Sequence, residues 1–157
     1  MPYQERFLAA SHGAGTRGRG AMLRAPIRWG ELRSRYDALL SANLNPQYPV
    51  DRWNLLARYR IWQVYQGYSQ ELKFDCFDSF YRDADSSGCW RFYVPAGQGQ
   101  YTLLTIRLQM VTGKNAVRML LNRHPAGDAS SRLADDRRIR LIVRPDIESR
   151  NFHEPTK

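Results

Sequence analysis

Hydrophobic and polar residues alternate with a period of two along most of the chain after residue 52. The longest run covers residues 53–64, where aromatic and aliphatic side chains take every second position. Shorter runs follow at 72–81, 90–94, 101–110, 117–122 and 138–144. Because side chains of a strand point alternately to its two faces, each run predicts a half-buried β-strand. The apolar run at 35–44 fits either a buried strand or a short helix.

Turn-forming residues separate the predicted strands. They stand at 45–49, 67, 83–88, 95–99 and 112–115, and a polar segment without a period covers 124–136. Pro145 is expected to end the last strand, because proline has no backbone N–H to donate. Strands at this spacing, with no helical period between them, predict an all-β fold, namely an antiparallel β-sandwich of the supersandwich type. A closed barrel is the alternative arrangement.

The first 27 residues have a different composition from the rest of the chain. Residues 11–20 read SHGAGTRGRG, a small, glycine-rich and basic stretch that cannot contribute to a core. We therefore predict a flexible Gly/Arg-rich arm over residues 1–27 and one β-sandwich domain over residues 28–157. An arm that touches RNA is the functional alternative to a flexible lead-in.

The chain is strongly basic, with 24 Lys and Arg against 15 Asp and Glu and a net charge of +9. A nucleic-acid-binding protein usually gathers its basic residues in one stripe or arm. Here they recur along every predicted strand, which is typical of solvated strand faces. Nucleic acid is therefore not the expected partner, and a basic nucleic-acid-binding β-domain stays the alternative function.

The two cysteines, Cys76 and Cys89, lie in strand-like runs without a His or a second Cys at metal-ligand spacing. They predict two buried, reduced thiols, and a disulfide between them is the alternative if their strands are neighbours. The N-terminus lacks the apolar region of a signal peptide, and no apolar stretch reaches the length of a membrane span. The expected location is the cytoplasm, with no membrane partner.

No complete set of catalytic residues can be assembled from the sequence. The three histidines stand in the arm, in a polar loop and near the C-terminus, and no G-x-S-x-G motif is present. Most acidic residues fall in turns, where capping is their ordinary role. We predict no catalytic residue, no metal site and no cofactor. Asp37 differs, because it lies in an apolar run and needs a partner such as Arg35.

Aromatic residues make up 12% of the chain and are dense in its first half. Trp53 and Trp62 stand on the longest predicted strand, where an aromatic ring can stack on the apolar face of a sugar. The same rings serve equally well in a core or an interface. Trp53 and Trp62 are therefore candidates for contact with carbohydrate or with another domain.

Two motifs at the ends of the predicted domain resemble those of one family. Residues 34–40 read SRYDALL and are followed by Asn-Pro and Val-Asp-Arg, while residues 142–153 read IVRPDIESRNFH. Both resemble the N-terminal domain of the bacterial glycogen-debranching (amylo-α-1,6-glucosidase) family. The resemblance spans residues 29–157.

The resemblance implies a β-sandwich that precedes a catalytic (α/α) barrel of the same parent protein, an α-1,6-glucosidase-type glycoside hydrolase. The barrel carries the two catalytic acids, so the isolated chain is expected to be inactive. Domain packing or internal ion pairing is the expected role of the motif residues, and contact with α-glucan is the alternative. The motif positions are Arg35, Tyr36, Arg150, Phe152 and His153, and Asp37 lies beside them.

Overall fold

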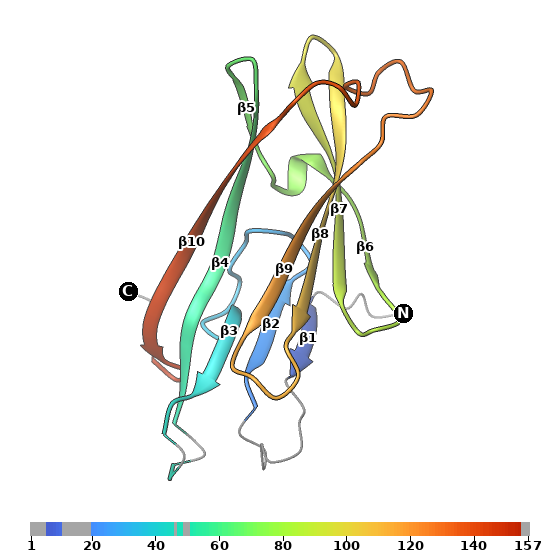
Figure 1. Ribbon diagram of the computed structural model, residues 1–157. Coiled ribbons are helices and arrows are strands. Elements are labelled where there is room, and N and C mark those ends of the chain that lie inside the picture. The colour runs from blue at the N-terminus through green and yellow to red at the C-terminus, as the bar shows by residue number, and fades with distance from the viewer. Residues whose placement is uncertain (1–5, 11–19, 46, 49–50, 155–157) are drawn as a thin grey trace.

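The computed structural model describes residues 6–10, 20–45, 47–48 and 51–154, and these form two antiparallel β-sheets that face each other (Figure 1). The first sheet has the order β1-β2-β3-β4-β10, and β5 pairs with β4 beside this path. Its strands are β1 (Arg6–Ala10), β2 (Met22–Pro26), β3 (Ala38–Asn43), β4 (Arg52–Tyr65), β5 (Tyr68–Glu71) and β10 (Arg140–Asn151).

The second sheet has the order β6-β7-β8-β9, and every pair within it is antiparallel. Its strands are β6 (Phe77–Arg82), β7 (Gly88–Gly97), β8 (Gln100–Met110) and β9 (Val117–His124). A short 3-10 turn, η1 (Phe74–Cys76), carries the chain from the first sheet to the second. The described strands form two separate sheets, so the β-sandwich is confirmed and the closed barrel is wrong.

Aromatic side chains join the two sheets in the core. The Trp90 ring of β7 lies 5.6 Å from the Phe7 ring of β1 and 5.3 Å from the Trp29 ring, both edge-on. Phe7, Trp90 and Phe92 are fully buried. Gly88 is required beside them, because an added Cβ would stand 2.7 Å from the Phe7 ring. Edge-on aromatic pairs of this kind add to the hydrophobic stabilisation of the sandwich.

The alternating runs predicted the strands well, with two corrections. The run at 35–44, which fitted either a strand or a short helix, contains the strand β3. The run at 72–81 is a strand only from Phe77, because η1 turns the chain before it. The last strand does not end at Pro145 but continues to Asn151. Because β10 lies at the edge of its sheet, a residue without an N–H is tolerated there.

The flexible arm predicted for residues 1–27 is wrong for two parts of that range. Residues 6–10 and 22–26 form β1 and β2, which pair with each other along their whole length. Phe7 and Leu23 point into the core and are fully buried, so burial of these side chains orders the segment. Residues 11–19, the centre of the predicted arm, lie outside the described residues.

The carboxylate of Asp37 is completely buried just before β3. The Nε atoms of Arg6 and Arg24 donate to its Oδ1 at 3.0 and 3.2 Å. The backbone N–H of Arg33 donates to Oδ2 at 2.9 Å. The expected need for an arginine partner is met from β1 and β2, while Arg35 instead donates to the hydroxyl of Tyr36. Asp37 therefore ties two strands to the turn that precedes β3.

We expect Asp37→Asn to lower the free energy of unfolding by about 2 to 3 kcal/mol, because two guanidinium groups lose a buried carboxylate. Urea unfolding followed by tryptophan fluorescence measures the loss. Asp136→Asn is the matched control, since the Asp136 side chain is 77% exposed and its replacement should change stability by less than about 0.5 kcal/mol. Equal stabilities of the two variants would contradict the structural role of Asp37.

Candidate functional site

The two terminal motifs meet at one end of the first sheet. There β10 pairs with β4 so that Arg150 lies opposite Asn54 and Asn151 lies opposite Trp53. The backbone N–H of Phe152 donates to the carbonyl of Arg52 at 2.7 Å, which continues the pairing beyond the strand. The C-terminal motif therefore lies beside the start of β4.

The carbonyl oxygen of Arg35 joins the first motif to the second. It accepts a hydrogen bond from Nη2 of Arg150 at 2.9 Å and another from Nδ2 of Asn54 at 3.0 Å. Asn54 is fully buried and accepts from the hydroxyl of Ser41 at 2.6 Å. Glu148 completes the arrangement by pairing with Arg150 at 3.1 Å. The buried amide of Asn54 thus fixes the backbone of the first motif at Arg35. Arg150 of the second motif binds the same carbonyl oxygen.

Aromatic rings form the outer part of this junction. The Tyr36 ring lies 4.7 Å from the Phe152 ring and 6.1 Å from the His153 ring. The guanidinium of Arg35 lies 4.9 Å from the Tyr36 centroid. We call the five residues Arg35, Tyr36, Arg150, Phe152 and His153 the motif cluster. The structure brings all five together, although Arg35 and Arg150 are 115 positions apart.

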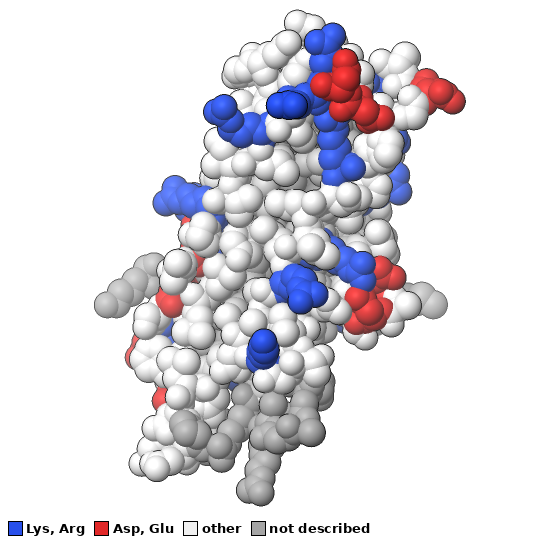
Figure 2. All heavy atoms as spheres, in the orientation of Figure 1, with Lys and Arg blue, Asp and Glu red and all other residues white. Residues whose placement is uncertain are grey.

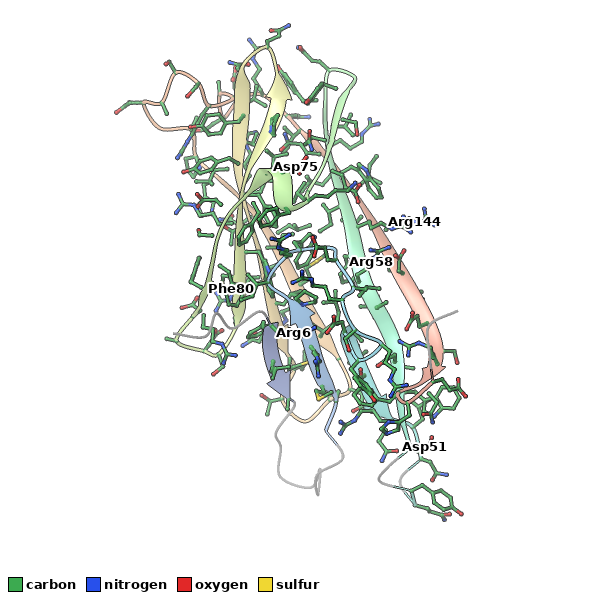
Figure 3. All side chains as sticks on the ribbon, turned by 180° about the vertical axis from the view of Figure 1, so that it is seen from behind. Arg6, Asp51, Arg58, Asp75, Phe80 and Arg144 are labelled. Atoms are coloured by element: carbon green, nitrogen blue, oxygen red, sulfur yellow. The ribbon has the colours of Figure 1, made fainter. Side chains whose placement is uncertain are left out.

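The two tryptophan candidates lie in different places. The indole N–H of Trp53 donates to Oδ1 of Asp51 at 2.8 Å, so Trp53 borders the motif cluster. Trp62 lies towards the other end of β4, opposite Ile142 of β10, and is not part of the cluster. Figure 3 labels Asp51, the hydrogen-bond partner of Trp53, at one end of the β4–β10 pair and Arg144 farther along β10.

Sequence reasoning missed a second network around Asp146, a residue of the C-terminal motif. Nε of Arg58 donates to Asp146 at 2.8 Å and Nη2 of Arg60 at 2.9 Å, while Nη1 of Arg58 reaches the carbonyl of Gly30 at 2.6 Å. Arg58 and Arg60 also line a cleft of about 550 Å³ with Trp29. The alternating arginines of β4 indicated that one face of the strand is charged. They did not indicate that Asp146 of β10 is the acid that pairs with them.

The environment of Asp146 favours its ionised form. Partial burial acts to raise the pKa of this carboxyl, but the hydrogen bonds from Arg60 and Arg58 outweigh burial. The pKa of Asp146 therefore lies below its ordinary value. The carboxylate is a structural anion, held between two guanidinium groups, and is poorly suited to exchange a proton near neutral pH.

Burial raises the pKa of both thiols. Cys76 and Cys89 are free and buried, as expected. Burial raises the pKa of Cys76 to about 11, so the thiolate that a nucleophile requires is scarce at neutral pH. Within the described part of the chain, no three His, Cys, Asp or Glu side chains gather as metal ligands. The motif cluster is an assembly of rings and guanidinium groups that contact one another.

The fold and the motif cluster together define a β-sandwich module whose two end motifs form one surface. The family model described as glycogen debranching enzyme N terminal matches residues 15–157. The chain therefore belongs to this family and is the N-terminal module of a glycogen-debranching-type enzyme, as its motifs predicted. No curated protein and no solved structure shows significant similarity to the chain. No helix of the described residues is long and apolar enough to cross a membrane.

We expect Asp146→Asn to lower the free energy of unfolding by about 1 to 2 kcal/mol at neutral pH. Because the folded-state pKa of Asp146 is depressed, its contribution is present above the unfolded value of about 3.9 and is lost as pH falls through the folded value. The difference between wild type and variant should therefore shrink below about pH 4. Urea unfolding at a series of pH values measures this difference, and a difference independent of pH would contradict it.

Proposed function

We propose that this chain is a non-catalytic module that packs on the catalytic (α/α) barrel of a debranching enzyme and helps it to hold α-glucan. The parent enzyme is an α-1,6-glucosidase-type glycoside hydrolase, and its expected location is the cytoplasm, where the two free thiols stay reduced. The barrel supplies the acids for hydrolysis. Family membership supports this arrangement. The main structural support is the exposed surface of β10.

The edge strand β10 exposes apolar side chains on both of its faces. Ile142 is 47% exposed, Val143 38% and Ile147 77%. The pairing with β4 shifts register on both sides of Ile147, and such irregularities re-aim a side chain. We call Ile142, Val143 and Ile147 the apolar strip. The exposed Arg140 precedes the strip, and the exposed Arg144 lies between Val143 and Ile147. Apolar side chains together with arginine are common in protein interfaces.

The apolar strip lies on the same strand, β10, as Arg150 of the motif cluster. Ile147 stands three positions before Arg150, and Arg150 donates a hydrogen bond to the carbonyl oxygen of Arg35. A domain that covers the strip would therefore reach the cluster as well. This proximity along the strand supports domain packing as the role of Arg35, Tyr36, Arg150, Phe152 and His153.

The distribution of charge favours this proposal over nucleic-acid binding. Figure 2 shows basic side chains in small separate groups on the visible face, some of them beside acidic ones. Arg58 and Arg60 share Asp146, and Arg6 and Arg24 share Asp37. Nucleic-acid binding requires basic groups that are available to phosphates along one path. Paired arginines on separate surfaces do not provide such a path.

We expect the purified chain to release no glucose from limit dextrin and to bind a separately produced catalytic barrel of a debranching-family enzyme. Ile147→Glu should weaken that binding at least about tenfold, since it puts a charge into the apolar strip. Biolayer interferometry measures the affinity. Leu8→Glu is the matched control, because Leu8 is 53% exposed at the opposite edge of the same sheet.

Measurable hydrolysis by the isolated chain would overturn the non-catalytic role. Equal weakening of barrel binding by Ile147→Glu and Leu8→Glu would remove β10 as the docking surface. Both replacements are at exposed positions, so thermal unfolding should be unchanged and can verify that each variant is folded.

A further inference from the structure

The outer face of the second sheet carries a hollow that neither motif reaches. It has a volume of about 390 Å³ and is built from residues of β6, β7, β8 and β9 and of the turn between β6 and β7. Tyr81, Thr105, Arg107, Leu120, Asn122 and His124 line it, and we call it the outer hollow. Its volume is in the range of sites that bind small ligands.

The strand register sets the layout of the outer hollow. In one row across the sheet, Tyr81 pairs with Cys89, Cys89 with Arg107, and Arg107 with Leu120. In the next row, Thr105 lies opposite Asn122. Most residues of the hollow stand on strands, so the sheet fixes their backbone positions, while Asp83 belongs to the turn between β6 and β7.

Two polar groups of the hollow are already oriented. The guanidinium of Arg107 is held by Asp85, by the hydroxyl of Ser87 at 3.1 Å and by Asp83 at 3.4 Å. The hydroxyl of Thr105 lies 2.6 Å from Nε2 of His124. Groups held in this way lose little conformational freedom when a ligand binds.

The basic group of the hollow is already paired with acidic groups. Arg107 forms ion pairs with the carboxylates of Asp83 and Asp85, which together carry two negative charges against one positive charge, and Figure 2 shows acidic and basic side chains together over the turn between β6 and β7. An anionic ligand such as a phosphate would gain little from a guanidinium that is already neutralised. A neutral ligand that both donates and accepts hydrogen bonds suits this set of groups better.

An aromatic ring and an aliphatic side chain complete the site. Tyr81 is 47% exposed and Leu120 is 50% exposed, and they stand at the two ends of one row. Sugar rings present apolar faces for such side chains and hydroxyl groups for Arg, Asn, Thr and His. We infer that the outer hollow binds a segment of neutral α-glucan. The choice of α-glucan among neutral sugars rests on the proposed function.

Glycogen co-sedimentation with the purified chain tests the inference. We expect binding that changes little between about 0.1 and about 0.5 M NaCl, because no counterions are released by a neutral ligand. Tyr81→Ala and Asn122→Ala should each raise the dissociation constant, by about tenfold for Tyr81→Ala. Tyr68→Ala is the matched control, because Tyr68 is 43% exposed but belongs to the first sheet.

Three outcomes separate this inference from the proposed function. Equal affinities of the Tyr81→Ala and Tyr68→Ala variants for glycogen would overturn the outer hollow as the glucan site. Absence of glycogen binding by a folded wild type that still binds the barrel would overturn the hollow and leave the docking role intact. Binding that depends on Tyr81 and Asn122, in a chain that does not bind the barrel, would support the hollow and overturn the docking role.

Discussion

The buried carboxylate of Asp37 is the constraint on which the rest of the structure depends. A buried charge is unfavourable unless it is paired, and the Asp37 carboxylate forms ion pairs with Arg6 of β1 and Arg24 of β2. The N–H of Arg33 binds the same carboxylate, so the turn before β3 is fixed as well. Arg35 and Tyr36 are part of that turn, and their positions follow from it. The position of the motif cluster therefore depends on the ion pairs of Asp37 with Arg6 and Arg24.

The second requirement is the long pairing of β4 with β10. It extends from Arg140 opposite Val64 to Asn151 opposite Trp53, and it carries the C-terminal motif back to the start of β4. Only there can Arg150 reach the carbonyl of Arg35. Asp146 fastens the middle of the same pair through Arg58 and Arg60. The two motifs thus meet because Asp37 positions one of them and the β4–β10 ladder positions the other.

Sequence patterns predicted what depends on local alternation and missed what depends on distant partners. The strands β4, β7, β8 and β9 were found because one face of each is apolar. The short strands β1 and β2 were missed because they border a glycine-rich segment and are stabilised by burial of Phe7 and Leu23. The tolerance of Pro145 depends on β10 being an edge strand, a property of topology. The true partners of Asp37 lie 31 and 13 positions away, beyond local pattern.

The two sheets offer surfaces of different chemistry, and this division fits a module that serves a larger enzyme. The first sheet ends in an apolar edge at β10 beside the motif cluster, which suits a protein partner. The second sheet carries the outer hollow, with oriented polar groups beside exposed Tyr81 and Leu120. A partner on β10 would leave the outer face of β6–β9 accessible, because the two surfaces belong to different sheets. Docking on a barrel and holding a glucan segment are therefore compatible in one chain, and neither requires an acid of its own.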